Sequence, residues 1–246
     1  MAARAAAPAG GRGAGARVLR FGVTERRLHI VHASAFLVMF ATGLVLYLPM
    51  LAQIFSSRPV VKAIHLTAAV AWLTALALVA ILGDRHALRR TRREIERLDA
   101  DDLLWLRNRG RGAPQGRFNA GQKLHASIQA ALAVLFTVSG VLLWLGERDT
   151  AWRLPGSIAL HDMATLVAGV LVAGHIWMAI SPRGLPAIQG ILHGTVPAAW
   201  VAEHHPKWQA EPPAEERPAR AGPLRLAAAG VVLTLGFAGI SFLIFT

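Results

Sequence analysis

IALHDMATLVAGVLVAGHIWMAI, at residues 158–180, is an apolar run long enough to cross a membrane as one helix, and it carries two histidines. His161 and His175 are 14 residues apart, which is close to four helical turns, so both side chains share one face. The helical rise separates them by about 21 Å, within a hydrocarbon core of roughly 30 Å. Ionisable side chains at such depths are functional candidates because they are costly. The pattern indicates axial ligands of two haems, with partner histidines at matching depths on other helices.

The composition is that of a membrane protein. Of the 246 residues, 54% are hydrophobic and 16% are charged, and the mean hydropathy is +0.44. The chain has no cysteine, which excludes disulfides, cysteine-ligated iron–sulfur clusters and covalently attached c-type haem. The net charge of +12 does not indicate nucleic-acid binding, because the basic residues cluster in loops between apolar segments, as membrane topology requires.

Five apolar stretches are long enough to span a lipid bilayer as helices. They cover roughly residues 30–52, 61–83, 124–146, 157–181 and 224–246. We therefore expect an all-α membrane protein: a four-helix transmembrane bundle that binds two b-type haems, plus a fifth transmembrane helix at the C-terminus. The expected divisions are a disordered basic tail (1–20), the haem domain (21–210), a linker (211–222) and the additional helix (223–246).

The distribution of Lys and Arg predicts the orientation in the membrane. The N-terminal tail and the segments after the second and fourth spans hold 22 of these residues, and the two remaining loops hold 4. The positive-inside rule then places the N-terminus in the cytoplasm and the C-terminus on the periplasmic side of a bacterial inner membrane. The stretch RHALRRTRREIERLDADDLLWL, within 84–121, is expected to form a short amphipathic helix at the cytoplasmic surface.

This topology assigns a depth to each histidine within the spans. His29 and His32 lie at the cytoplasmic end of the first span, and His65 lies near the outer end of the second. By depth, His65 matches His161, and either His29 or His32 matches His175. Two bis-histidine haems, one in each leaflet, follow from these pairs.

Other interpretations of the histidines remain open. His125 opens the third span on the cytoplasmic side, where it lines the inner haem or a quinone pocket, or lies at headgroup level. Intramembrane histidines also serve as interhelical hydrogen-bonding groups or as a proton relay in a transporter. A structural alternative is a membrane anchor without haem. A zinc site is disfavoured because the two pairs lie too far apart to converge on one ion.

Three stretches resemble the cytochrome b (gamma) subunit of membrane-bound respiratory formate dehydrogenases. They are RFNAGQKLH at 117–125, the histidine-bearing run at 158–180 and AEHHPKW at 202–208. The first two spans also fit, so the resemblance covers about residues 20–210. The histidine helix alone would equally fit the cytochrome b subunit of a nickel–iron hydrogenase, and an anchor for that or another periplasmic oxidoreductase is the closest alternative. The fifth span departs from the four-helix pattern of the family.

The resemblance implies particular haem ligands. In the first span the ligand falls on His29, but Ile30 stands where the family usually has tryptophan, which keeps His32 as an alternative. The implied ligands of the haem iron are His29 with His175 at the inner haem, and His65 with His161 at the outer haem.

The resemblance also implies a quinone pocket beside the inner haem. The N-A-G-Q element of the family falls on Asn119, Gly121 and Gln122, which would face menaquinone or ubiquinone. Asn119 followed by Gln122 is at the same time a good helix-start signal, and the two roles can coexist.

The implied partners are an Fe–S (beta) subunit and a catalytic (alpha) subunit with a molybdenum or tungsten pterin cofactor. Electrons would enter from the Fe–S subunit at the outer haem, cross to the inner haem and reduce the quinone. The chain itself would carry no catalytic residue for formate oxidation, and it would act as the electron-transferring, quinone-reducing subunit of the complex.

Overall fold

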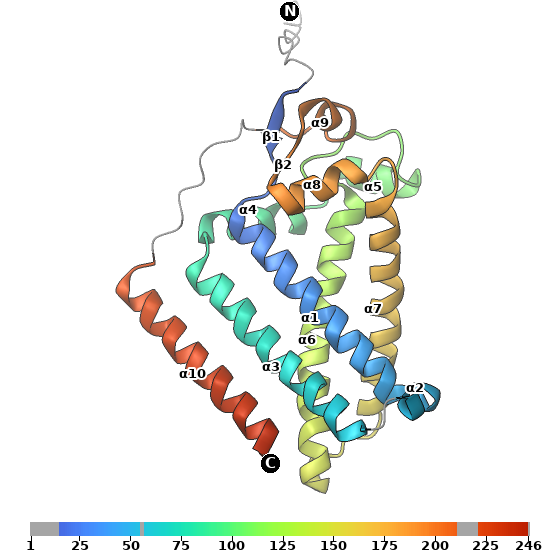
Figure 1. Cartoon of the computed structure of the whole chain (residues 1–246). Coiled ribbons are helices and arrows are strands. Elements are labelled where there is room, and N and C mark those ends of the chain that lie inside the picture. Colours follow the sequence, from blue (N-terminus) through green and yellow to red (C-terminus); the bar gives the residue numbers. More distant parts are fainter. Residues whose placement is uncertain (1–14, 55–56, 211–220, 246) are drawn as a thin grey trace, which may run out of the picture.

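The computed structural model describes residues 15–54, 57–210 and 221–245 (Figure 1). The elements are β1 (Arg17–Leu19), α1 (Val23–Tyr47), α2 (Pro49–Ile54), α3 (Arg58–Leu82), α4 (Arg85–Glu96), α5 (Ala100–Arg107), α6 (Ala120–Arg148), η1 (Thr150–Trp152), α7 (Ser157–Ile180), α8 (Leu185–His193), β2 (Thr195–Pro197), α9 (Ala198–His204) and α10 (Pro223–Phe245). Among the described residues, five helices are long and apolar enough to cross a membrane, namely α1, α3, α6, α7 and α10. The predicted all-α membrane fold is confirmed.

Two helix pairs make the bundle. Helix α1 packs along α3, α6 packs along α7, and α1 also contacts α7 (Figure 1). Leu132 of α6 is buried with Ala164 and Ala168 of α7, and Phe36 of α1 packs against this cluster. The small alanine side chains let the helix backbones approach closely, which is how helices associate where lipid offers no hydrophobic driving force.

The first span differs from its predicted bounds of 30–52. Helix α1 starts earlier, at Val23, because its first two turns are polar and precede the apolar window. It ends at Tyr47 because Leu48 precedes a proline and adopts an extended conformation with φ −93° and ψ 111°. Pro49 then begins the separate short helix α2.

The predicted single amphipathic helix is in fact two helices. The side chain of Asp84 accepts hydrogen bonds from the first turn of α4. Asp99 starts a second helix, α5, because its carboxylate accepts from the backbone N–H of Asp102, while Asp102 accepts from that of Asp99. This reciprocal capping box favours a new helix start over continuation of α4.

The prediction of a disordered tail over residues 1–20 is wrong for residues 17–20. Strand β1 pairs antiparallel with β2, and Val18 is buried against Val196 and Val201. Each strand has only three residues, and the two are far apart in the chain, so no local sequence pattern predicts them. Residues 1–14 of the predicted tail and 211–220 of the predicted linker lie outside the described residues.

One end of the bundle is covered by a layer that we call the cap, consisting of residues 15–22, 84–118 and 181–210. Figure 1 shows β1, β2, α4, α5, α8 and α9 gathered at this end. Gly194 ends α8 with a positive φ of 86°, and its carbonyl oxygen accepts hydrogen bonds from the backbone N–H groups of Arg20 and Phe21. The cap is thereby joined to the start of α1.

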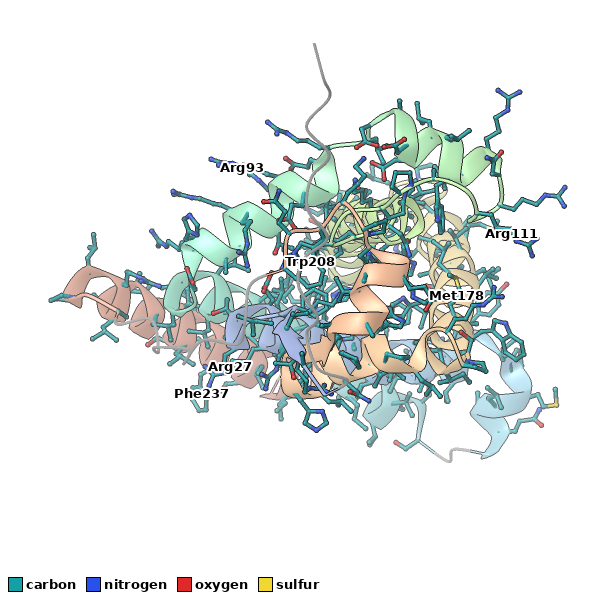
Figure 2. All side chains as sticks on the ribbon, turned by 90° about the horizontal axis from the view of Figure 1, so that it is seen from above. Arg27, Arg93, Arg111, Met178, Trp208 and Phe237 are labelled. Atoms are coloured by element: carbon teal, nitrogen blue, oxygen red, sulfur yellow. The ribbon has the colours of Figure 1, made fainter. Side chains whose placement is uncertain are left out.

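Helix α10 packs against α3 at the edge of the bundle (Figure 1). A Cβ on Gly236 would overlap the side chain of Thr74, so glycine permits the close approach of the two helices. The Arg225 guanidinium donates to the backbone oxygens of Ile81 (2.6 Å) and Gly83 (2.7 Å), at the C-terminal end of α3. Phe237 is 76% exposed on the opposite side of α10 and is labelled in Figure 2.

We predict that a disulfide forms between α10 and α3 in the variant Val70→Cys, Gly239→Cys. A Cβ built on Gly239 lies 3.4 Å from Val70 Cγ1, an atom in the position that the sulfur of a cysteine at residue 70 could take, so the two cysteines are close enough to react. Because the chain has no cysteine of its own, electrophoresis before and after reduction reads out this bond alone. The control pair Val70→Cys, Phe237→Cys should stay reduced, and cross-linking of the control but not of the test pair would contradict this packing.

Candidate functional site

The first histidine pair lies toward the end of the bundle away from the cap. His65 of α3 and His161 of α7 have ring centroids 6.5 Å apart. A hydroxyl group from a neighbouring helix contacts each ring: Thr42 Oγ1 of α1 lies 2.9 Å from His65 Nδ1, and Ser139 Oγ of α6 lies 2.8 Å from His161 Nδ1. All four helices of the bundle therefore contribute to this pair.

The two hydroxyl groups determine which ring nitrogen is free. Thr42 donates its hydroxyl hydrogen to the Val38 carbonyl (2.7 Å), and Ser139 donates to the Leu135 carbonyl (2.7 Å). Each hydroxyl oxygen is therefore left to accept from a histidine Nδ1–H. Both imidazoles then carry the proton on Nδ1 and present the lone pair of Nε2, which is the arrangement that metal-ligating histidines adopt.

A glycine follows each of these hydroxyl residues. A Cβ on Gly43 would lie 3.5 Å from His65 Cε1, and one on Gly140 would lie 3.8 Å from His161 Cε1. Glycine therefore keeps open the space beside each ring. Sequence reasoning missed Thr42 and Ser139, although a detectable signal exists: a hydroxyl residue followed by glycine occurs in the C-terminal half of both helices.

The second histidine pair lies at the cap end of the bundle. His29 of α1 and His175 of α7 have ring centroids 6.2 Å apart, and His125 of α6 stacks on His175 with centroids 4.8 Å apart and ring planes 10° apart. His32 is turned to a different neighbour, because its Nδ1 accepts a hydrogen bond from Trp72 Nε1 at 3.3 Å. The geometry thus brings His29, and not His32, to His175.

The spacing of both pairs fits an iron atom between the rings. When two imidazoles bind one metal from opposite sides, each metal–nitrogen bond is about 2 Å, which places the ring centroids about 6 Å apart. The centroid separations of 6.5 Å and 6.2 Å match that value. Gly43 and Gly140 add space beside the rings of His65 and His161. The ring separations are thus compatible with a haem iron at each pair. Within the described residues, no three metal-binding side chains gather around one point.

The N-A-G-Q element lies where the cap meets α6. Asn119 Oδ1 accepts from the backbone N–H of Gln122 (2.9 Å), and Gln122 Oε1 accepts from that of Asn119 (3.1 Å), so the two residues form a capping box. A Cβ on Gly121 would lie 3.2 Å from the ring of Trp105, so glycine makes room for that indole. Gln122 precedes His125 by three residues and therefore shares its face of α6.

A buried ion pair holds the cap to the bundle. The Arg117 guanidinium donates to Glu25 Oε1 of α1 at 2.9 Å and to Glu94 Oε2 of α4 at 2.6 Å, and Arg117 and Glu25 are both buried. Nearby, Lys123 of α6 pairs with the buried carboxylate of Asp102 at 2.5 Å. Removing one partner from such a pair typically costs about 3–5 kcal/mol, so these contacts fix the cap relative to α1 and α6.

The AEHHPKW stretch is also structural. His205 is buried and its Nδ1–H donates to the Gly116 carbonyl at 2.6 Å. Lys207 pairs with Asp99 (2.5 Å) and Asp101 (2.9 Å) of the α5 region, contacts that raise the pKa of Lys207. Burial, followed by the positive charge of Arg20, lowers the pKa of His205 to about 4. The stretch therefore connects α9 to the loop before α6.

A helical membrane bundle that carries histidine pairs at two depths is the architecture of a membrane cytochrome b. The chain belongs to the prokaryotic cytochrome b561 family, whose model matches residues 20–194. Membership of this family implies that the protein is an integral membrane protein that binds haem b.

Curated relatives match most of the chain. It is similar to the cytochrome b556(fdo) subunit of formate dehydrogenase from Escherichia coli K12, with 26% identity over 206 residues, covering 79% of this chain and 92% of that protein. It is also similar to the formate dehydrogenase cytochrome b556 subunit of Haemophilus influenzae, with 26% identity over 212 residues, covering 79% of this chain and 83% of that protein. A third relative is the cytochrome b556(Fdn) subunit of the nitrate-inducible formate dehydrogenase of Escherichia coli K12, with 24% identity over 209 residues, covering 79% of this chain and 91% of that protein.

We predict that titration of His205 makes the cap acid-sensitive. The folded pKa of about 4 lies below the ordinary value of 6.5, so between these values the unfolded chain binds more protons than the folded one. The contribution of neutral His205 to the free energy of unfolding is therefore fully present above pH 6.5. It is lost as the pH falls toward 4, by on the order of 3 kcal/mol. Denaturant unfolding in detergent micelles at a series of pH values from 7 to 4 measures this loss.

The variant His205→Asn keeps a side-chain N–H donor but does not titrate, so its unfolding free energy should depend less on pH than that of the wild type. His204→Asn, at the adjacent and more exposed position, should retain the wild-type acid dependence. Equal pH dependence of all three proteins would assign the acid sensitivity to other groups.

Proposed function

We propose that this chain is the membrane cytochrome b subunit of a respiratory formate dehydrogenase complex and passes electrons through two bis-histidine haems to a quinone. The observation that carries the proposal is the pair of histidine sites at two depths, with centroid separations of 6.5 Å and 6.2 Å. The choice of formate dehydrogenase as the complex is supported by the names of the relatives cited above, which are formate dehydrogenase subunits. The same names favour formate dehydrogenase over nickel–iron hydrogenase as the source of electrons.

Four histidines of the bundle would hold the two haems. His65 and His161 would bind the outer haem iron through Nε2, because Thr42 and Ser139 occupy their Nδ1 atoms. His29 and His175 would bind the inner haem iron. Haem b would supply one-electron redox chemistry at each site, and apolar side chains of α1, α6 and α7 pack together in the bundle.

The charge distribution supports a direction for the electrons. The cap is rich in arginine, so it would face the cytoplasm, and the pair His65 and His161 would face the periplasm. An Fe–S subunit docked on the periplasmic side would deliver electrons from a molybdenum- or tungsten-pterin subunit that oxidises formate. Moving one charge across the membrane potential is worth about 2.3 kcal/mol per 100 mV, so this direction of transfer couples formate oxidation to the potential.

The quinone would bind beside the inner haem at the start of α6. Gln122 shares a helix face with His125, whose ring stacks on His175. The capping box uses the side-chain oxygens of Asn119 and Gln122, and their amide nitrogens are the groups that would donate to a quinone carbonyl. Protons for the quinone would come from the cytoplasmic side, on which the cap would lie.

We predict that removal of single ligands deletes single haems. His161→Ala should remove the outer haem and His175→Ala the inner haem, whereas wild type should show two b-type haems per chain. His29→Ala should behave as His175→Ala does, and His32→Ala, at the neighbouring position that contacts Trp72, should retain both haems. Reduced-minus-oxidised absorption spectra with haem quantified per polypeptide provide the measurement. No haem in the wild-type chain, with haem supplied, would overturn the proposal.

We further predict that Ser139→Ala weakens the outer site without abolishing it. Loss of the hydroxyl that accepts from His161 Nδ1 leaves the ring free to rotate, and loss of a partner that orients a ligand typically weakens metal binding about 10–100-fold. Haem release to an acceptor protein should therefore be faster from the outer site. Thr137→Ala is the matched control, because Thr137 lies two residues away on α6 and its hydroxyl donates to the Ala133 carbonyl of its own helix rather than contacting a histidine of the described residues. Equal effects of both substitutions would rule out an orienting role for Ser139.

A further inference from the structure

Arg20, which follows β1, is the most deeply buried charged side chain of the cap, with 1% of its surface exposed. Its Nη2 donates to the Arg117 carbonyl at 3.0 Å and to Gln122 Oε1 at 3.3 Å. Its Nε and Nη1 are buried and have no hydrogen-bond partner among the residues that the structure describes. Buried polar groups in native proteins are almost always satisfied, so two unsatisfied nitrogens on one guanidinium indicate a missing acceptor.

The charges around Arg20 indicate that this acceptor is an anion. The buried carboxylate of Glu25 pairs with Arg117, and that of Asp102 pairs with Lys123. The rings of Trp200 and Phe21 lie against the Arg20 guanidinium with centroids 4.9 Å and 5.3 Å away. Burial and the charge of Arg117 lower the pKa of Arg20 to about 10, which leaves it a cation at neutral pH. A buried cation is strongly destabilising unless it is paired with an anion.

Contacts in the structure lead from Arg20 to the inner histidine pair. Arg20 contacts Gln122, Gln122 lies one helical turn before His125, and His125 stacks on His175 at 4.8 Å. On α1, Arg26 lies one turn before His29 on the same face, and its Nε is likewise buried without a partner among the described residues. Two basic side chains with unsatisfied nitrogens therefore lie on the cap side of the inner pair.

We propose that Arg20 is an anion-binding, potential-setting residue of the inner haem site, where its unpartnered N–H groups take a haem propionate carboxylate. Propionates are the charged edge of haem b, and from a site at the cap end of the bundle the nearer polar region is the cap. Arg20 holds this carboxylate by charge-assisted hydrogen bonds, and its positive charge disfavours the oxidised haem, so it raises the midpoint potential. This inference rests on the proposed haem sites, and it adds a residue that positions and tunes the inner one.

The test is a redox titration of the purified full-length chain with both haems bound, in Arg20→Gln, Arg20→Lys and Arg17→Gln. The inner haem is identified as the component that His175→Ala removes. Arg20→Gln should lower the midpoint potential of the inner haem and leave that of the outer haem unchanged. Arg20→Lys keeps the charge and should retain most of the potential. Arg17 lies three residues earlier, is exposed on β1 and bonds Thr195 and Gln189, so Arg17→Gln should match the wild type.

Each other outcome counts against the inference. Two bound haems with an unchanged inner potential in Arg20→Gln would overturn it while leaving the proposed function intact, whereas a wild type without haem would remove the proposed function itself. A shift seen only in vesicles of anionic phospholipid, and absent in phosphatidylcholine vesicles, would assign the anion to a lipid headgroup. If Arg20→Gln does not accumulate, haem release is measured in Arg20→Lys instead. Lysine cannot reproduce the geometry of the guanidinium N–H groups, so haem release from the inner site of Arg20→Lys should be several-fold faster than in wild type. An unchanged rate would overturn the inference.

Discussion

A polar group inside a bilayer has to find its partner within the protein, and this constraint organises the whole bundle. Backbone groups meet it by forming helices, but an imidazole needs a specific neighbour. The neighbours are supplied between helices: hydroxyls of α1 and α6 bond His65 and His161, and Trp72 of α3 bonds His32 of α1. The order in which the helices pack, with α1 beside α3 and α6 beside α7, is the order that brings these polar partners together.

The cap solves the complementary problem at the polar end. Segments from the start, middle and late part of the chain meet there through Arg20, Arg117 and His205, each of which donates to a backbone carbonyl of another segment. The RFNAGQKLH and AEHHPKW stretches are distinctive because they form this junction. Arg117 joins Glu25 of α1 to Glu94 of α4, and Lys207 joins α9 to Asp99 and Asp101. The inner histidine pair therefore lies beneath a cap whose segments are joined by these hydrogen bonds and ion pairs.

Sequence alone predicts the membrane spans and the depth of each histidine because both follow from local hydrophobicity and helical periodicity. It predicts the pairing of depths, but it leaves His29 and His32 as alternatives, since residues three apart share a face and only the position of Trp72 separates them. Sequence alone could not predict the pairing of β1 with β2, because it joins residues more than 170 positions apart. The burial of Arg20 was equally hidden, because it depends on contacts with residues about 100 positions away. The hydroxyl partners Thr42 and Ser139 could have been found, since each precedes a glycine at the depth of the outer pair.

Helix α7 carries one histidine of each pair, and this has a mechanical consequence. Helices in a bundle slide and tilt against one another, but the length of a single helix hardly changes, because its backbone hydrogen bonds resist stretching along the axis. The 14 residues from His161 to His175 therefore set a fixed distance between the two proposed haem sites. Electron tunnelling slows exponentially with distance, so a constant distance between the two sites keeps the transfer rate steady while the surrounding helices fluctuate in the membrane.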